Sequence, residues 1–213
     1  FGSCYDINGT VISVLFLLGC YVVGSIPFGY LIGRLTAGID VRKIGSGNIG
    51  ATNVMRILGP LPALVVLFLD AAKGWLCVWL AMRLGFSDPL IAASALAVVA
   101  GHNWSLFLKL KGGRGIATAL GILLGWAPYV ALALVGVFVI VVTISRYVSL
   151  GSIIASALLP MALFVNGLPK VYIAAGFVLS VWSIVRHIPN IRRLLSGTES
   201  RFGARVHPPG PSM

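Results

Sequence analysis

Long apolar stretches alternate along this chain with short segments that are polar, glycine-rich or basic. The apolar stretches are residues 11–33, 61–82, 89–108, 116–145 and 148–185. A helix needs about 20 mostly apolar residues to cross a membrane, so each stretch predicts at least one membrane-spanning helix. The last stretch is interrupted at residues 166–170 by Asn, Gly, Leu, Pro and Lys, and it therefore predicts two helices.

The stretch 116–145 can be read in two ways. As one helix it would be about 45 Å long, compared with about 30 Å for the hydrocarbon core of a bilayer. Gly125, Trp126 and Pro128 mark a place where a turn could form, since proline breaks helices and tryptophan favours the membrane interface. The stretch is either one tilted, kinked pass or two short ones.

The distribution of Lys and Arg favours two short passes. Two passes give seven spans, with 13 Lys and Arg on one face of the membrane, two on the other and Lys73 inside a span. One pass gives six spans, with eight Lys and Arg on one face and seven on the other. Cytoplasmic loops carry the excess of Lys and Arg. We therefore predict an all-α integral membrane protein, a seven-span helical bundle with its N-terminus outside and its C-terminus in the cytoplasm.

Composition agrees with this fold class. Hydrophobic residues make up 58% of the chain and charged residues only 10%, whereas soluble domains carry about 25% charged residues. A water-soluble globule and a disordered chain are therefore excluded. We expect one membrane domain over residues 1–197, followed by a mobile, basic, proline-containing tail over 198–213.

The candidate chemistry lies in three segments that the predicted topology brings to the cytoplasmic face. In the first, Gly45, Gly47 and Gly50 would let successive N–H groups form a nest for an anion, and Arg56 would grip phosphate. The spacing also matches G-x-G-x-x-G, but no strand precedes it, so a dinucleotide site is not indicated. The alternative is a flexible interhelical loop.

The second segment surrounds Lys111, Gly112, Gly113 and Arg114. Basic side chains and glycines just before a helix are typical of a phosphate cradle, while the alternative is anchoring by the positive-inside rule. His102 lies in the preceding span, as either a functional group or a hydrogen-bonded packing residue.

In the third segment His187, Asn190 and Arg193 recur at three-residue spacing and could share one helix face. The alternative is a basic helix lying on anionic lipid. Asp70 and Lys73 are three residues apart within a span, and we interpret them first as a structural ion pair.

Other chemistries are poorly supported by the sequence. Only five carboxylates are present, and Cys4, Cys20 and Cys77 lack metal or redox spacing. We therefore expect no metal, no cofactor and no thiol nucleophile. No basic patch interleaved with aromatics indicates nucleic acid. The site is expected to offer Arg56, Lys111, Arg114 and Arg193 without opposing carboxylates.

Taken together and in order, these segments resemble the bacterial acyl-phosphate-dependent glycerol-3-phosphate acyltransferases, the PlsY family. The resemblance covers about residues 20 to 197 and departs from the family's pattern at Ser105, where Pro is common, and at Arg114, where Lys is common. The matching stretches are Gly24-Ser25-Ile26-Pro27-Phe28-Gly29, Ser46-Gly47-Asn48-Ile49-Gly50-Ala51-Thr52-Asn53 with Arg56, Lys111-Gly112-Gly113-Arg114-Gly115-Ile116-Ala117-Thr118, Arg146-Tyr147-Val148-Ser149-Leu150, and Arg186-His187 with Asn190-Ile191 and Arg193-Leu194-Leu195.

The resemblance implies a seven-span bundle that transfers an acyl chain from acyl phosphate to the 1-hydroxyl of sn-glycerol 3-phosphate. The products would be lysophosphatidic acid and phosphate, in the first step of phospholipid synthesis. It also implies the roles of the site residues. The catalytic residues are Ser46, Arg56, Arg114, His187 and Asn190, and the substrate-binding residues are Gly47, Asn48, Gly50, Thr52, Asn53, Lys111, Gly112, Gly113, Ser149, Ser152 and Arg193.

We expect direct attack by the acceptor hydroxyl, without an acyl-enzyme. Either His187 takes the proton of this hydroxyl, or the substrate's own phosphate takes it and His187 only binds. The partners would be the two substrates and membrane lipid. The protein would lie in a bacterial inner membrane with its site on the cytoplasmic side. The sequence does not determine the oligomeric state, and a monomer is one of the alternatives. The alternative functions are a membrane transporter of a phosphorylated metabolite and a non-catalytic lipid-binding assembly protein.

Overall fold

The computed structural model describes residues 4–204 and 206, with side chains from Gly9 onward. In this part of the chain every regular element is a helix. The α-helices are α1 (Cys4–Ser25), α2 (Phe28–Ala37), α3 (Ala51–Leu58), α4 (Pro60–Arg83), α5 (Asp88–Asn103), α6 (Ile116–Trp126), α7 (Pro128–Ser145), α8 (Val148–Val165), α9 (Lys170–Arg186) and α10 (Ile188–Leu195), and the 3-10 turns are η1 (Val41–Lys43) and η2 (Leu106–Leu108).

Five segments are long and apolar enough to cross a membrane: Gly9–Ala37, Pro60–Arg83, Asp88–Leu108, Pro128–Ser145 and Val148–Val165. Helices α9 and α10 make a sixth if their bent pair, at 53°, counts as one span. The predicted first span over residues 11–33 is interrupted between α1 and α2, because Pro27 has no N–H to continue the helix.

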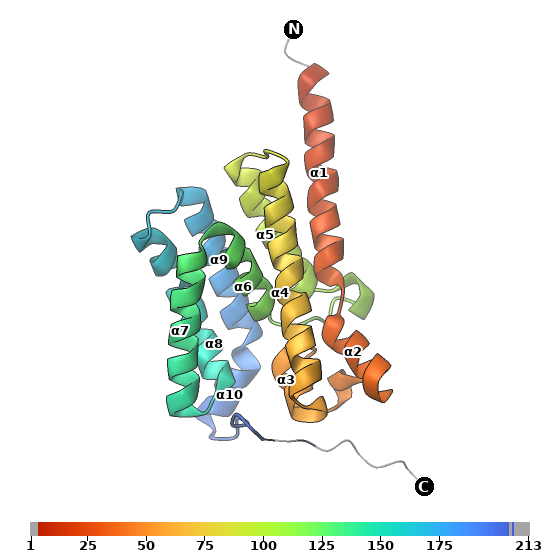
Figure 1. Ribbon diagram of the computed structural model, residues 1–213, viewed down its shortest axis with the longest axis vertical. Coiled ribbons are helices and arrows are strands. Elements are labelled where there is room, and N and C mark those ends of the chain that lie inside the picture. The colour runs from red at the N-terminus through yellow and green to blue at the C-terminus, as the bar shows by residue number, and fades with distance from the viewer. Residues whose placement is uncertain (1–3, 205, 207–213) are drawn as a thin grey trace.

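The ambiguous stretch 116–145 forms two helices, as predicted. Helix α6 ends at Trp126 and α7 begins at Pro128, and the two are joined by a turn (Figure 1). With 11 residues, α6 is only about 16 Å long. It is too short to cross a bilayer unaided, so the structure supports five or six spans and does not establish seven.

Helix α6 is held close to α4. A Cβ atom at Gly74 would overlap the carbonyl oxygen of Thr118, and one at Gly121 would overlap that of Ala71. Glycine at both positions therefore lets the two backbones meet, as is common between helices in membranes. This contact fixes the start of α6, and with it the loop that carries Arg114.

The predicted ion pair in the second apolar stretch is confirmed. Lys73 Nζ lies 2.7 Å from Asp70 Oδ1, and it also donates to His102 Nδ1 at 2.9 Å and to the carbonyl oxygen of Ile26 at 3.1 Å. Charged groups inside a membrane need such partners. His102 is thus part of a hydrogen-bonded buried cluster that joins α4 to α5.

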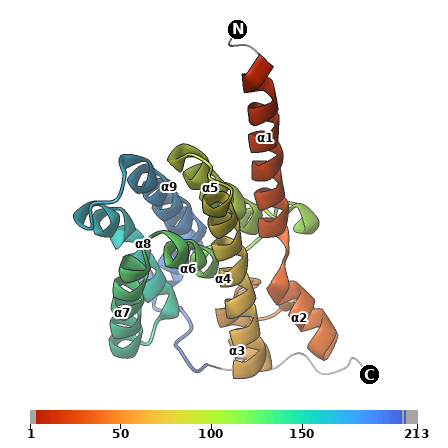
Figure 2. The ribbon, with the colours of Figure 1, turned by 45° about the horizontal axis from the view of Figure 1, so that its top comes forward.

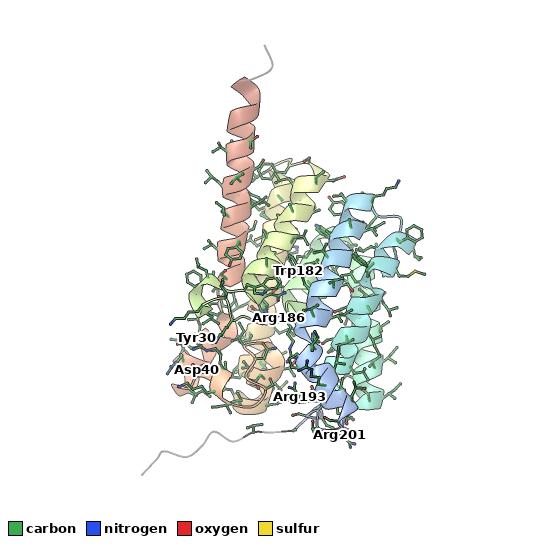
Figure 3. The ribbon with its side chains drawn as sticks, turned by 180° about the vertical axis from the view of Figure 1, so that it is seen from behind. Tyr30, Asp40, Trp182, Arg186, Arg193 and Arg201 are labelled. Atoms are coloured by element: carbon green, nitrogen blue, oxygen red, sulfur yellow. The ribbon has the colours of Figure 1, made fainter. Side chains whose placement is uncertain are left out.

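The basic and polar segments gather at one end of the bundle. Helix α1 starts at one end of the long axis, whereas α3 and α10 lie at the other (Figure 1). Asp40, Arg193 and Arg201 are found at that same end when the molecule is seen from behind (Figure 3). The segment after α10 runs across this end toward α3, in the tilted view as well (Figure 2).

Candidate active site

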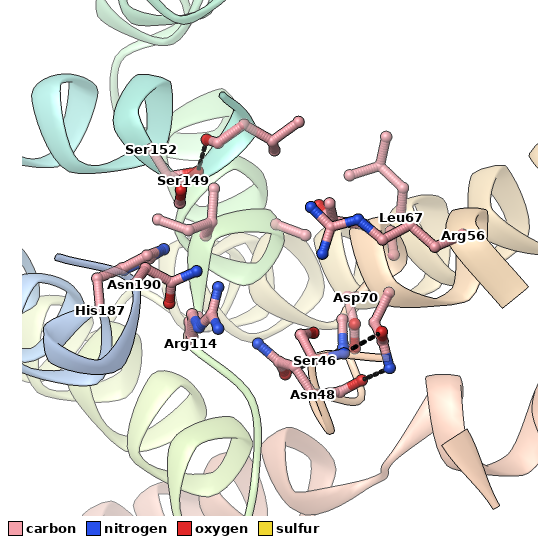
Figure 4. A pocket seen from close by; sticks show the side chains of 18 of the residues that line it. Ser46, Asn48, Arg56, Leu67, Asp70, Arg114, Ser149, Ser152, His187 and Asn190 are labelled. Atoms are coloured by element: carbon pink, nitrogen blue, oxygen red, sulfur yellow. Dashed lines mark hydrogen bonds between the residues drawn. The ribbon is translucent and has the colours of Figure 1, made fainter. Parts of the chain in front are cut away.

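A cavity of about 140 Å³ lies among the ends of α3, α6, α8 and α10. In Figure 4 the guanidinium groups of Arg56 and Arg114 point toward a common space, which His187, Asn190 and Ser149 face from other sides. Most of the predicted site residues line this cavity: Ser46, Asn48, Gly50, Thr52, Asn53, Arg56, Arg114, Ser149, Ser152, His187 and Asn190. The other predicted residues do not belong to its lining: Gly47, Lys111, Gly112, Gly113 and Arg193.

Arg56 and Arg114 supply the positive charge of the cavity. Burial lowers the pKa of Arg114 to about 10, and it also lowers the pKa of Arg56. With a pKa of about 10, the Arg114 guanidinium stays protonated at neutral pH. A buried guanidinium can form paired hydrogen bonds to phosphate oxygens, which makes the cavity suited to a phosphate group.

The amide of Asn53 organises the loop before α3. Its Nδ2 donates to the carbonyl oxygens of Val41, Ile44 and Asn48 at 2.9–3.1 Å, and its Oδ1 accepts the N–H of Ser46 at 2.9 Å. The side chain is 1% exposed. Asn53 thus holds the loop in shape, and its Nδ2 has no N–H left for a substrate.

The predicted anion nest is not supported by the hydrogen bonds of this loop. The N–H of Gly47 donates to the carbonyl of Ile44, and the N–H of Gly50 donates to Asn48 Oδ1. The N–H of Ser46 is also used, by Asn53. These three N–H groups are therefore not available to an anion, and the positively charged side chain that this segment places at the cavity is Arg56.

The glycines before α6 are also occupied. The N–H of Gly112 donates to the carbonyl of Asn103 at 3.1 Å, and that of Gly113 to the carbonyl of His102 at 2.9 Å. Lys111 is exposed. The predicted cradle therefore reduces to Arg114, which these glycines place at the cavity.

His187 and Asn190 come from the junction of α9 and α10. His187 Nδ1 lies 2.8 Å from the carbonyl oxygen of Ser183, which can only accept, so Nδ1 carries the proton in the neutral ring. Its Nε2 is then a proton acceptor. Asn190 Oδ1 is buried without a hydrogen-bond partner in the described structure, so it is free to accept a hydrogen bond.

Glu199 is the site residue that the sequence interpretation missed. Its Oε1 accepts hydrogen bonds from Ser149 Oγ and Asn190 Nδ2, both at 2.7 Å, and its Oε2 accepts from Arg193 Nε at 2.7 Å. Burial opposes ionisation, but these hydrogen bonds outweigh it and lower the pKa of Glu199. The expectation of a site without an opposing carboxylate is therefore wrong, and Arg193 is paired.

The start of the predicted tail packs onto the bundle. The carbonyl of Ser200 accepts from Arg56 Nη2 at 3.2 Å, the N–H of Phe202 donates to the carbonyl of Arg146, and the N–H of Val206 donates to the carbonyl of Arg56. The predicted mobility of the remaining tail, residues 205 and 207–213, lies outside the described residues.

Replacing Glu199 with glutamine is expected to lower the melting temperature at pH 7 by about 5 °C, because a carboxylate that accepts three hydrogen bonds is lost. The folded-state pKa is below the ordinary 4.5, so this stabilisation is complete above pH 4.5 and is lost as the pH falls. Thermal melts from pH 7 to pH 3 should show the two proteins converging. A gap that stays constant with pH would contradict this.

A second, apolar cavity of about 600 Å³ adjoins the first. It lies between α3 and α4 on one side and α7 and α8 on the other. Its wall includes Leu64 and Val139, which are 57% and 50% exposed, so it opens toward the lipid-facing side. Both cavities share the same boundary residues: Ala51, Thr52, Arg56, Leu67, Phe138 and Val148.

Comparison with known proteins assigns this arrangement to a family. The family described as Glycerol-3-phosphate acyltransferase matches residues 14–197. The chain belongs to that glycerol-3-phosphate acyltransferase family. It is 47% identical over 193 residues to the glycerol-3-phosphate acyltransferase of Synechococcus sp. (strain CC9902), covering 91% of this chain and 96% of that protein. It is 48% identical over 186 residues to that of Geobacter sulfurreducens, covering 86% and 94%.

Solved structures agree with the family assignment. The glycerol 3-phosphate form of PlsY, an integral membrane glycerol 3-phosphate acyltransferase, matches with a TM-score of 0.86 and 41% identity, over 90% of this chain and 96% of that one. Its lysophosphatidic acid form matches with a TM-score of 0.84 and 40% identity. The chain is therefore an integral membrane acyltransferase. Glu199 lies just beyond the region that the family match covers.

Proposed function

We propose that this acyltransferase moves an acyl chain from acyl phosphate to the 1-hydroxyl of sn-glycerol 3-phosphate, giving lysophosphatidic acid and phosphate as the first step of phospholipid synthesis. The named relatives and the two forms of the solved PlsY structure support the acceptor and the product. The proposed donor supplies a second phosphate, which suits a cavity that holds two guanidinium groups.

The observation that carries the proposal is the wall shared by the two cavities. Arg56 belongs to the lining of both, so a phosphate bound there lies next to the entrance of the apolar cavity. An acyl phosphate joins those two chemistries within one molecule. We place its phosphate among Arg56 and Arg114 and its chain between α4 and α7, on the lipid side.

The proposed reaction is a direct transfer without an acyl-enzyme. The acceptor hydroxyl oxygen forms an ester bond to the acyl carbon, the bond from that carbon to the phosphate oxygen breaks, and phosphate leaves with the electron pair. The guanidinium groups stabilise the negative charge that develops on the reacting groups, and the two bound phosphates hold the reactants together.

The hydroxyl proton has two candidate acceptors. One is His187 Nε2, whose availability follows from the bond between Nδ1 and the Ser183 carbonyl. The other is the phosphate of glycerol 3-phosphate itself, in which case His187 only binds the hydroxyl. The unpaired Oδ1 of Asn190 would accept a hydrogen bond from a glycerol hydroxyl.

We further propose seven spans, an outer N-terminus, a cytoplasmic C-terminus and a catalytic face on the cytoplasmic side of a bacterial inner membrane. The excess of Lys and Arg in the segments that include α3 and α10 supports this orientation. Seven spans require the short helix α6 and the loop around Arg114 to cross the bilayer together. They also require this loop to be accessible from the cytoplasm. Cysteine labelling from each side would test it.

One assay tests the reaction. Purified protein is given acyl phosphate and labelled glycerol 3-phosphate, with and without EDTA, and acyl-CoA replaces acyl phosphate as the control donor. We expect labelled lysophosphatidic acid from acyl phosphate at an unchanged rate in EDTA, and none from acyl-CoA. Product from acyl-CoA alone would overturn the donor assignment. Counterflow of glycerol 3-phosphate in vesicles without any product would favour a transporter instead.

A further inference from the structure

The two glycines before Arg114, Gly112 and Gly113, are held by hydrogen bonds on two sides. On one side, the N–H groups of Gly112 and Gly113 donate to carbonyls at the end of α5. On the other, Arg186 donates from Nη2 to the carbonyl of Gly112 at 2.8 Å and from Nε to the carbonyl of Gly113 at 2.9 Å. All four backbone polar groups of the pair are therefore bonded, which fixes the loop as a rigid unit.

Only glycine fits in this position. A Cβ atom at Gly112 would overlap the carbonyl oxygen of His102, and one at Gly113 would overlap the imidazole Nε2 of the same residue. The glycines thus let the loop lie directly on the end of α5, with its carbonyls turned toward α9. These carbonyls are where the guanidinium of Arg186 binds.

Arg186 connects two parts of the site that are far apart in the sequence. It holds Gly113, which directly precedes Arg114, and it is itself directly followed by His187. Arg114 and His187 both line the cavity, whereas Arg186 is absent from its lining in the described structure. Figure 3 shows Arg186 on α9, above Arg193. Its effect on the reaction would therefore pass through its neighbours.

We infer that Arg186 is a positioning residue, which fixes the Arg114 guanidinium relative to the His187 imidazole by clamping the Gly112 and Gly113 carbonyls. The planar guanidinium offers two parallel donors to two successive carbonyls, which a single ammonium cannot match in geometry. This inference rests on the proposed function, because it takes Arg114 and His187 to act on the substrates.

The test compares Arg186→Ala and Arg186→Lys with the exposed control Arg192→Ala. We expect Arg186→Ala to lower kcat about 30- to 100-fold with a smaller change in KM, since a displacement of about 1 Å has an effect of this size. Arg186→Lys keeps the charge and is expected to lose about tenfold. Methylguanidine should restore at least about a third of the lost kcat in Arg186→Ala but not in Arg186→Lys, where the ammonium fills the space.

The outcomes separate the clamp from a merely structural role. If Arg186→Ala and Arg186→Lys both keep kcat within about threefold of the wild type, the inference is overturned. The inference is also overturned if the loss of kcat in Arg186→Ala follows the decrease in its melting temperature and methylguanidine restores neither kcat nor the melting temperature. If Arg186→Ala does not fold, the kcat of Arg186→Lys decides alone.

Failure of the proposed function would look different. A wild-type protein that makes no lysophosphatidic acid from acyl phosphate would refute the reaction, whatever the variants do. Full activity in Arg114→Ala would refute the site but would leave the hydrogen bonds of Arg186 without a catalytic role. Loss of activity in Arg114→Ala together with normal activity in the Arg186 variants would refute the clamp alone.

Discussion

Replacing Arg114 with alanine is expected to lower kcat/KM about 1000-fold while the protein still folds. Arg114 is a half-buried guanidinium whose pKa burial lowers to about 10, so it is charged at neutral pH. Its removal leaves Arg56 as the remaining cavity-lining guanidinium in the described structure. Initial rates over a range of glycerol 3-phosphate and acyl phosphate concentrations would measure the loss, and a thermal melt would check the fold.

Arg114→Lys is the matched control. Lysine keeps the positive charge but offers a point ammonium in place of a planar fork. If the charge is what matters, we expect Arg114→Lys to stay within about tenfold of the wild type. Wild-type turnover in Arg114→Ala would show that this guanidinium is not part of the catalytic site.

The second large effect is expected for Arg56→Ala, with a loss of about 100- to 1000-fold in kcat/KM. Arg56 lies at the boundary of the polar and apolar cavities, and its Nη2 also donates to the Ser200 carbonyl. We expect KM for acyl phosphate to rise as well as kcat to fall, because we propose that the phosphate of the donor binds at this position. Steady-state kinetics with each substrate varied in turn would separate the two effects.

Arg34→Ala controls for the loss of one positive charge. Arg34 is exposed at the end of α2 and does not line the cavity as the structure describes it. Its removal should leave the rate within about twofold, as is usual for an exposed charge. Equal losses in Arg34→Ala and Arg56→Ala would mean that net charge, and not a specific phosphate contact, drives the reaction.

The membrane fold could be predicted largely from the sequence because its signals are strong and additive. Apolar stretches gave the positions of α4, α5, α7, α8 and α9, and Pro128 marked the break before α7. The interruption at Pro27 was missed, since a proline in an apolar run gives no sign of whether the helix kinks, ends or continues. Eleven apolar residues in α6 likewise do not reveal whether the segment crosses the bilayer.

For the site, residue types were easier to predict than their hydrogen bonds. Arg56, Arg114 and His187 were expected together because the predicted topology brings their three segments to one face of the bundle, and all three line the cavity. The glycine N–H groups were interpreted as phosphate ligands, but those of Gly47, Gly50, Gly112 and Gly113 are bonded to the chain itself. Spacing shows that a loop can turn, whereas the direction of each N–H depends on the tertiary contacts.

Glu199 escaped prediction for a related reason. It lies in a short segment between Gly197 and a proline-containing end, where composition indicates an exposed tail. One signal was available: Asp40 and Glu199 are the only acidic residues in the segments predicted to face the cytoplasm, and Arg193 lies within reach of Glu199 along the chain. A lone carboxylate among many cations is a good candidate for a buried partner.

The apolar cavity opens sideways between α4 and α7. This determines the unit in which the concentration of the lipophilic reactant must be expressed. We propose that it arrives by lateral diffusion, so its useful concentration is a mole fraction among the surrounding amphiphiles rather than a molarity in the buffer. Extra detergent would dilute it in two dimensions while leaving the water-borne acceptor untouched. Rates from different micelle or bilayer preparations are therefore comparable only at equal surface density.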